Sequence, residues 1–92
     1  MPPTTFMFYV YVLKSLKDSN FYIGCTNDLR RRFREHNMGV SKSTRDRVPF
    51  ELVYYEAYKS LNDARRREAR LKGFKNAYKE LIKRLEDSLG KT

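Results

Sequence analysis

Residues 6–38 read FMFYVYVLKSLKDSNFYIGCTNDLRRRFREHNM, and this stretch decides the fold. Its first part, Phe6 to Leu13, is apolar on both alternating faces and rich in Tyr, Val and Phe, which is typical of a strand buried on both sides. Asp18-Ser19-Asn20 supplies turn residues, and Phe21 to Cys25 has the pattern of a second strand. Because the connection is short, the sequence predicts an antiparallel hairpin.

A helix is predicted directly after the hairpin. Thr26, Asn27 and Asp28 are all helix-capping residue types, so the helix should begin there. We expect it to run to about Met38 and to end at Gly39, because glycine readily adopts the conformation that closes a helix.

The next segment is a polar, basic loop over residues 40–49, followed by a third predicted strand over residues 50–58, which alternates and is rich in aromatic residues. Ser60 and Asp63 resemble a capping box, with the shorter acid at the third helical position. They predict a second helix that runs to about Lys72 and ends near Gly73.

Asn76 can cap a last helix that runs to about Leu89, with Gly90 as its stop. The predicted order is therefore β-β-α-β-α-α, an α+β fold in which a small three-stranded sheet, antiparallel or mixed, is flanked by three helices. We expect one domain over residues 1–92, with the motifs contained in residues 6–89.

The overall charge points to a polyanionic partner. The chain of 92 residues carries 20 Lys and Arg against 11 Asp and Glu, a net charge of +9. Nucleic acid is the simplest such partner; a basic protein without one, or one that meets an anionic membrane surface, is the alternative. The single cysteine, Cys25, excludes an internal disulfide, and with only one histidine it argues against a zinc site within one chain.

The expected location is cytoplasmic. The first ten residues, MPPTTFMFYV, contain neither a basic segment nor a long apolar segment, so we expect no signal peptide. The longest apolar run is far too short to span a bilayer, and no membrane association is expected.

The first helix carries four arginines that a helical projection separates. With about 100° between successive residues, Arg32 and His36 lie beside the apolar stripe of Leu29 and Phe33. A planar guanidinium at that place suits phosphate binding, with His36 one turn away. The alternative is a solvated basic helix with a structural histidine. Three arginines point away and suit contacts with a nucleic-acid backbone: Arg30, Arg31 and Arg34.

One carboxylate is predicted to lie on the wrong face of the second helix. Glu68 falls inside the apolar stripe, which is formed by Leu61, Ala64 and Leu71. An inward glutamate is costly unless it is paired, hydrogen-bonded or bound to metal. It therefore suits a hard divalent cation. An ion pair with Arg32 or Lys72 is the alternative, and no second inward acid is evident.

The tyrosines near the start are spaced so that they converge. Tyr9 and Tyr11 share one face of the first strand, and Tyr22 and Gly24 share one face of the second. If the hairpin pairs these faces, Tyr11 and Tyr22 meet, and Gly24 leaves room for a substrate. A tyrosine hydroxyl can act as a general base only if its pKa is depressed. Core packing is the alternative for either residue.

These motifs together resemble the GIY-YIG nuclease family, in its branch of small stand-alone bacterial single-domain proteins. That branch is similar to the catalytic domain of structure-specific resolvase nucleases. The first family triplet appears as Tyr9-Val10-Tyr11, with Tyr9 at the glycine position, and the second appears intact as Tyr22-Ile23-Gly24. The family's helix arginine matches Arg32, the His or Tyr position one turn later matches His36, and the metal-binding glutamate matches Glu68.

The resemblance implies a metal-dependent endonuclease that hydrolyses phosphodiester bonds in DNA, including branched or damaged structures of the kind met in DNA repair. In this mechanism Glu68 holds a single Mg²⁺ or Mn²⁺ ion, and Tyr22 or Tyr11 helps to deprotonate the attacking water. Arg32 stabilises charge on the phosphate, and His36 orients groups or shuttles a proton.

The outward arginines, together with Lys42, Arg45 and Arg47, are then expected to bind the DNA backbone, with a salt-dependent affinity. Two alternatives stay open. One is a non-catalytic nucleic-acid-binding module, and the other is a nuclease subunit that needs a protein partner. RNA also stays open as the substrate, and the sequence leaves the oligomeric state undecided.

Overall fold

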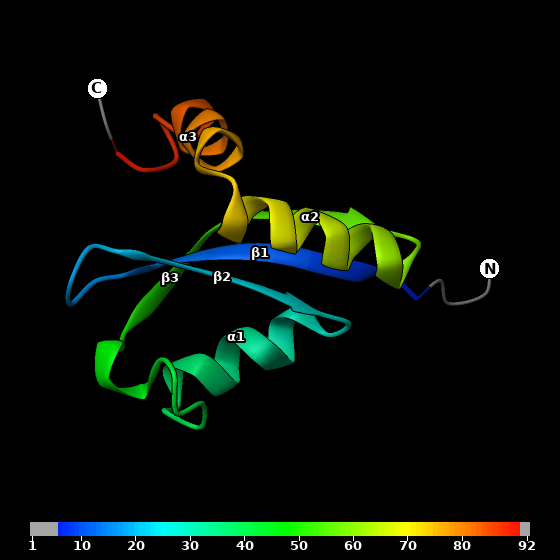
Figure 1. The fold of residues 1–92 in the computed structure, drawn as a ribbon. Coiled ribbons are helices and arrows are strands. Elements are labelled where there is room, and N and C mark those ends of the chain that lie inside the picture. Colours follow the sequence, from blue (N-terminus) through cyan, green and yellow to red (C-terminus); the bar gives the residue numbers. More distant parts are fainter. Residues whose placement is uncertain (1–5, 91–92) are drawn as a thin grey trace.

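One antiparallel sheet with β1 at its centre organises the chain, which a computed structural model describes over residues 6–90. The strand order is β2-β1-β3, and the order of elements is the predicted β-β-α-β-α-α (Figure 1). The elements are β1 (Phe8–Ser15), β2 (Phe21–Thr26), α1 (Leu29–Asn37), a 3₁₀ turn η1 (Arg45–Arg47), β3 (Phe50–Tyr58), α2 (Leu61–Gly73) and α3 (Lys75–Arg84).

The central strand is the one that the sequence predicts to be buried on both faces. Val10, Tyr11, Val12 and Leu13 are each at most 1% exposed. β1 can occupy the centre because consecutive apolar side chains satisfy both faces of the sheet at once. The strand is displaced from the predicted Phe6 to Leu13, because its pairing with β2 and β3 begins near Phe8 and continues past Leu13.

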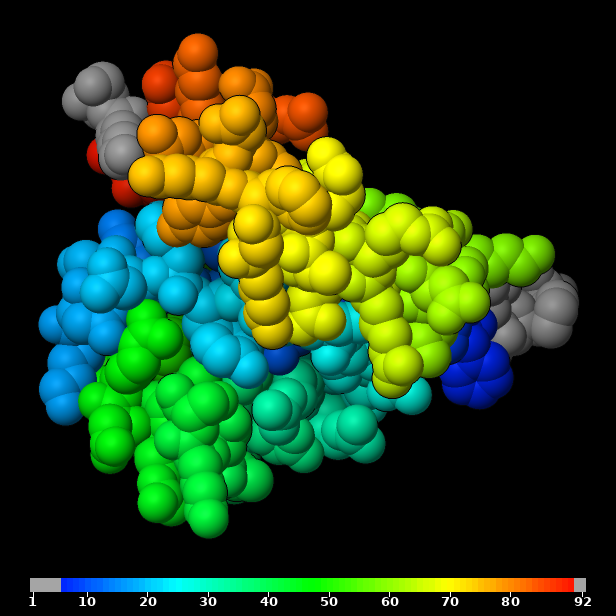
Figure 2. Space-filling model, viewed as in Figure 1, coloured from blue at the N-terminus to red at the C-terminus, as the bar shows by residue number. Residues whose placement is uncertain are grey.

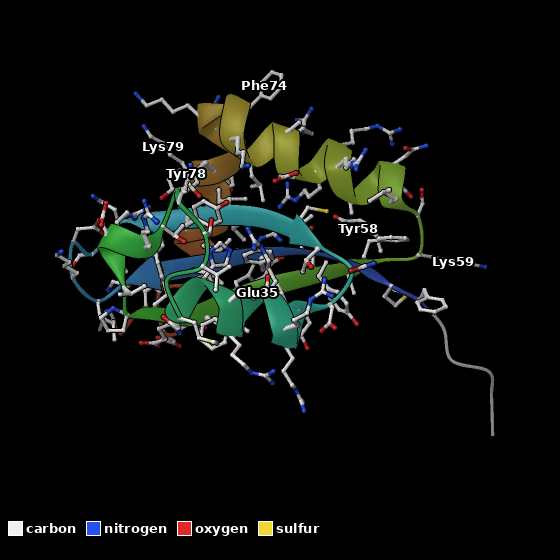
Figure 3. All side chains as sticks on the ribbon, turned by 90° about the horizontal axis from the view of Figure 1, so that it is seen from below. Glu35, Tyr58, Lys59, Phe74, Tyr78 and Lys79 are labelled. Atoms are coloured by element: carbon white, nitrogen blue, oxygen red, sulfur yellow. The ribbon has the colours of Figure 1, made fainter. Side chains whose placement is uncertain are left out.

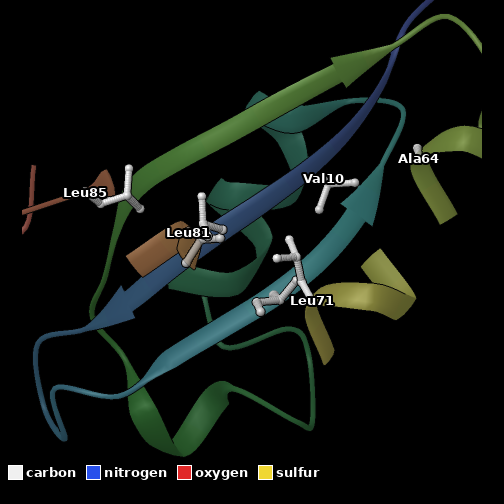
Figure 4. Packing of buried hydrophobic residues seen from close by; sticks show 7 residues of the cluster. Val10, Ala64, Leu71, Leu81 and Leu85 are labelled. Atoms are coloured by element: carbon white, nitrogen blue, oxygen red, sulfur yellow. The ribbon is translucent and has the colours of Figure 1, made fainter. Parts of the chain in front are cut away.

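Helices cover the two faces of the sheet unequally. α2 and α3 lie on one face and α1 lies on the other (Figure 1). The larger core lies under α2 and α3, where Val10 packs with Ala64, Leu71, Leu81 and Leu85 (Figure 4). On the α1 face the core is smaller and is built from Tyr11, Leu13 and Phe50. None of the helices within residues 6–90 combines the length and apolar character needed to cross a bilayer.

Most helix ends follow the predicted capping residues. Asp28 accepts a hydrogen bond from the Arg31 backbone N–H at the start of α1, and Gly39 closes that helix with φ of +76°. Ser60 caps α2 by accepting from the backbone N–H of Asp63. The predicted first and second helices are confirmed.

The junction between α2 and α3 differs from the prediction. Gly73 is the last helical residue of α2, and Phe74 alone, in an extended conformation, separates the two helices. Asn76 therefore lies inside α3 and does not cap it. α3 ends at Arg84, and a turn region with Gly90 at φ of +75° completes the described chain.

Ser15 connects the end of β1 to the loop before β3. Its hydroxyl donates to the carbonyl oxygen of Arg47 at 2.6 Å and accepts from the backbone N–H groups of Lys17 and Asp18. The side chain is fully buried. This one hydroxyl holds both the β1–β2 turn and the loop in place.

We expect Ser15→Ala to destabilise the protein by about 1–3 kcal/mol, because it removes the three part-buried hydrogen bonds of this hydroxyl. Denaturant unfolding measures the change. Ser88→Ala, at an exposed serine, is the matched control and should stay within about 0.5 kcal/mol of the parent protein. Equal effects of the two substitutions would contradict a structural role for Ser15.

Candidate active site

The Tyr11 ring lies across Gly24 in the neighbouring strand. The two residues are paired in the register of β1 and β2. A methyl group added at Gly24 would lie 2.3 Å from the Tyr11 hydroxyl oxygen and 2.5 Å from its Cζ. The space that the sequence suggested for a substrate is therefore filled by Tyr11, because the phenol needs the room that a glycine leaves.

A chain of buried hydrogen bonds starts at this tyrosine. The Tyr11 hydroxyl is 2.9 Å from Nε2 of His36, and Nδ1 of His36 is 2.8 Å from the Thr44 hydroxyl. All three side chains are at most 1% exposed. Burial and the charge of Arg32 lower the pKa of His36 to about 4, so the imidazole is neutral at pH 7. A neutral ring can donate one of these bonds and accept the other.

Tyr22 completes an aromatic cluster beside this chain. Its ring centroid lies 4.9 Å from that of His36 and 6.5 Å from that of Tyr11. Tyr22 is half-buried, whereas Tyr11 is closed off from solvent. Burial, followed by the neighbouring Tyr22, raises the pKa of Tyr11 to about 12 in spite of the opposing effect of Arg32. The convergence of Tyr11 and Tyr22 expected from their strand positions is present.

Arg32 lies at the open side of this cluster. Its side chain is 30% exposed, and Nη1 donates to Oε1 of Glu35 at 3.1 Å. Its charge acts on both Tyr11 and His36, since it contributes to the pKa of each. Arg32 and His36 share one side of α1 as the helical projection predicts, but His36 lies inside the core and not beside it. The contact with Glu35 was not anticipated.

Glu68 approaches from the other face of the sheet. It lies on α2 with its side chain 23% exposed, and Oε2 accepts a hydrogen bond from Nζ of Lys72 at 2.9 Å. Of the two ion pairs considered from the sequence, the one with Lys72 is present. Glu68 also contributes to raising the pKa values of Tyr11 and Cys25, which places its charge near β2. Figure 2 shows the molecule from the side on which the cyan strand β2 runs between the yellow α2 and the α1 region below.

The donor set around Glu68 limits the kind of metal site. Within residues 6–90, no three His, Cys, Asp or Glu side chains lie close enough to form a metal-binding group. Glu68 alone would supply one protein ligand. That fits Mg²⁺, which keeps several waters and is often held by one or two carboxylates together with substrate phosphate. It does not fit an ion that needs a complete protein cage.

Glu56 is a second acidic residue that points inward, and the sequence analysis does not predict it. Glu56 accepts hydrogen bonds from the hydroxyls of Tyr54 and Tyr58, and Nε of Arg67 lies 3.0 Å from its Oε2. Burial raises the pKa of Glu56, but these donors outweigh it and lower the pKa overall. Strand alternation does place Glu56 on one face with both tyrosines, which is the signal that was available. Since β3 and β2 are opposite edges, this cluster lies away from the candidate site.

The residues predicted to bind a nucleic-acid backbone differ in their surroundings. Arg47 is half-buried, with Nε 2.7 Å from Oδ2 of Asp18 and its guanidinium over the Phe50 ring. Its predicted role in binding stays a prediction, and the ion pair shows that it braces the loop against the β1–β2 turn. The other predicted residues are exposed on α1 and the following loop: Arg30, Arg31, Arg34, Lys42 and Arg45.

Comparisons with known proteins identify the family of the chain. Residues 7–82 match the GIY-YIG catalytic domain family. A UPF0213 protein of Halobacterium salinarum is 42% identical over 83% of this chain and 99% of its own length. A UPF0213 protein of Streptococcus pneumoniae is 44% identical over 78% of this chain and 73% of its own. The solution structure of a UPF0213 protein from Bacillus halodurans is 38% identical, with a TM-score of 0.54, covering 87% of this chain and 85% of the other.

We expect Gly24→Ala to destabilise the protein by about 1–3 kcal/mol, because the added methyl group displaces the Tyr11 ring from His36. Thermal or denaturant unfolding measures the change. Gly73→Ala is the matched control, since nothing lies within 4 Å of a Cβ there. It should stabilise α2 by up to about 1 kcal/mol. A neutral Gly24→Ala would contradict the close approach of Tyr11.

The stability of the protein should fall as the pH drops below about 6.5, because the pKa of His36 is 6.5 when unperturbed and about 4 in the folded protein. Between these values the unfolded chain binds more protons, so the free energy of unfolding decreases toward pH 4, by on the order of 3 kcal/mol. As the only histidine, His36 can be titrated directly by NMR. A midpoint near 6.5 in the folded protein would contradict its burial.

Proposed function

Because the chain belongs to the GIY-YIG catalytic-domain family, we propose that it is a metal-dependent endonuclease that hydrolyses phosphodiester bonds in DNA, in particular in branched or damaged structures. Domains of this family are generally endonucleases. One observation carries the proposal: Tyr11, Tyr22, Arg32 and His36 gather against the β1–β2 pair, and Glu68 on α2 lines a pocket together with Cys25 and Thr26 of β2.

Glu68 is the residue that would hold the ion. A bound Mg²⁺ or Mn²⁺ ion would stabilise charge on the scissile phosphate and promote ionisation of the attacking water. The Lys72 side chain, 51% exposed, is free to turn from Glu68 toward solvent or toward a substrate phosphate. The half-buried carboxylate of Glu68 thus pairs with Lys72 in the free protein and can exchange this partner for a metal ion.

The two tyrosines take different roles in this proposal. Tyr11 keeps its proton at neutral pH, since its pKa is raised to about 12, and its hydroxyl is bound to His36. It acts as a positioning residue. Tyr22 is half-buried and stacks edge-on against His36, so it is the tyrosine that can meet a water molecule beside the phosphate. We assign Tyr22 the role of assisting proton removal from that water.

Arg32 is the residue that contacts the phosphate. Its guanidinium carries five N–H donors, and Glu35 engages one side through Nη1. The Tyr11 hydroxyl also interacts with this guanidinium, and the donors that remain can meet phosphate oxygens. Such a preorganised cation is most effective where negative charge develops during reaction.

The surface around Arg32 would hold the DNA backbone. Arg30, Arg31 and Arg34 are exposed on α1, and Lys42 and Arg45 are exposed in the loop that follows. With a net charge of +9, the chain attracts a polyanion over a wide surface. Contacts of this kind depend on salt and not on base sequence.

A second candidate is a nucleic-acid-binding module that does not cut, or a subunit that cuts only with a protein partner. The ion pair between Glu68 and Lys72 favours it, because this pair satisfies the inward carboxylate without metal. The assay described next also tests RNA as the substrate.

We expect Glu68→Ala to abolish cleavage and to leave binding nearly unchanged, because the carboxylate serves the ion and not the DNA backbone. The assay uses labelled single-stranded, duplex, flap and four-way-junction DNA, and RNA, with Mg²⁺ or Mn²⁺. Wild type, Glu68→Ala, Lys72→Ala and the exposed-acid control Glu80→Ala are compared.

Lys72→Ala separates the two candidates, because it removes the ion pair but keeps the carboxylate. Unchanged cleavage by Glu80→Ala and measurable though weaker cleavage by Lys72→Ala, with none by Glu68→Ala, supports the nuclease. Binding by all four proteins without any cleavage supports the second candidate. Equal loss of folding in Glu68→Ala and Lys72→Ala would show that the pair is structural.

A further inference from the structure

A groove of about 500 Å³ lies next to the candidate site, between β2, the end of α2 and the start of α3. This volume falls within the range of roughly 300–1,000 Å³ typical of small-ligand sites. Four aromatic residues line it, together with two lysines: Phe21, Tyr22, Phe74, Tyr78, Lys72 and Lys75. The mechanism proposed above uses only Tyr22 and Lys72 of this set.

Phe74 is an aromatic side chain without a place in the core. It is 57% exposed, and it is the single residue between α2 and α3. In Figure 3 its ring points outward from the end of α2. The guanidinium of Arg70 lies over this ring, 5.1 Å from its centroid. An exposed phenylalanine beside a cation offers a stacking surface to a planar ligand that carries negative charge.

The inner wall of the groove is firm. Tyr78 is half-buried and its ring meets Phe21 edge-on, with centroids 6.3 Å apart. Gly73, an exposed lining residue, has no side chain, and a Cβ built there meets nothing within 4 Å. A larger side chain at this position therefore has room beside the groove.

The charge of the groove selects the ligand. Lys72 and Lys75 are both exposed at its lining, and no acidic side chain lines it. Lys72 also contacts Glu68, and Tyr22 also contacts His36, so the groove and the candidate active site share a border. A ligand that extends from the scissile phosphate into the groove, and that carries an aromatic ring and a phosphate of its own, matches this lining.

We propose that the groove binds an unpaired nucleotide next to the scissile phosphate, with its base against Phe74 and Tyr78 and its phosphate facing Lys72 and Lys75. This inference rests on the proposed nuclease function and narrows its substrate. The strand must be unpaired beside the cleavage point, as in a flap, an overhang or a single strand, because a base held in a duplex cannot enter the groove.

The test measures binding in a chelating buffer, so that cleavage plays no part. Fluorescence anisotropy gives the Kd for a blunt DNA duplex, for the same duplex with a short unpaired overhang, and for the matching RNA overhang. Gly73→Leu fills the groove from an open position, and Phe74→Leu removes the stacking ring. Tyr55→Leu is the matched control, an aromatic residue 53% exposed that does not line this groove.

We expect wild type to prefer the overhang, and Gly73→Leu and Phe74→Leu each to weaken overhang binding about fivefold or more. Blunt-duplex binding and its salt slope should not change, because a blunt duplex places no nucleotide in the groove. Tyr55→Leu should match wild type. An equal loss of affinity for the RNA overhang would show that the groove accepts an unpaired nucleotide of DNA or of RNA. A loss of affinity for the DNA overhang alone would assign the groove to DNA.

Other occupants of the groove would give different results. Equal losses on blunt duplex and overhang, or no loss with either variant, would overturn the proposal. Light scattering is run in parallel: a dimer of the wild type that Gly73→Leu abolishes would assign the groove to a second copy of the chain and would also overturn it. Thermal unfolding verifies that each variant is folded, and leucine at a helix end should not weaken α2.

The two proposals can fail separately. If no preparation cleaves DNA but the overhang preference disappears in Phe74→Leu, the groove proposal stands and the nuclease proposal falls. If wild type cleaves and both groove variants bind and cleave every probe as wild type does, only the groove proposal falls. Photocrosslinking with iodinated uracil in the overhang gives an independent readout: crosslinks to Phe74 or Tyr78 support the groove, and crosslinks confined to α1 contradict it.

Discussion

The hydrogen bond between Tyr11 and His36 is the interaction on which the site depends. It joins the central strand to α1, and through Thr44 it extends to the loop before β3. It can form because Gly24 leaves the Tyr11 ring a path across β2. The imidazole is neutral in the core, and each of its two ring nitrogens makes one hydrogen bond, Nε2 with Tyr11 and Nδ1 with Thr44. Arg32 and Tyr22 are then positioned against this rigid centre.

The sheet separates two sets of functional groups. Tyrosine, histidine and arginine lie on the α1 face, whereas Glu68, the predicted metal ligand, lies on α2 at the opposite face. Because β2 is an edge strand, the two sets can approach each other around it without crossing the sheet. The edge thus provides a place where a phosphate can touch a cation from one face and a carboxylate from the other. The aromatic groove beside Phe74 continues this edge beyond Tyr22.

Local sequence patterns predicted much of the fold and part of the site. The unbroken apolar run around Val10 identified a strand buried on both sides, and Asp28 and Ser60 marked the starts of two helices. The helical projection placed Glu68 inside the apolar stripe and Arg32 and His36 beside theirs; Arg32 lies at such a boundary, Glu68 is partly buried, and His36 lies deeper, inside the core. The capping prediction was wrong at Asn76, which lies inside α3 and does not cap it, and the sequence analysis missed Glu56, whose carboxylate pairs with Arg67 from another element.

Periodicity, capping and charge in the sequence alone determined the order of elements, the buried strand and the inward direction of the site residues, because each depends on neighbours within a few positions. The identity of each contact was decided only by the tertiary structure. Tyr11 fills the space at Gly24, Arg47 pairs with Asp18, and Phe74 stays exposed beside a groove. These outcomes depend on residues distant in sequence, and burial and ion pairing acquire their free energy only when the chain brings such residues together.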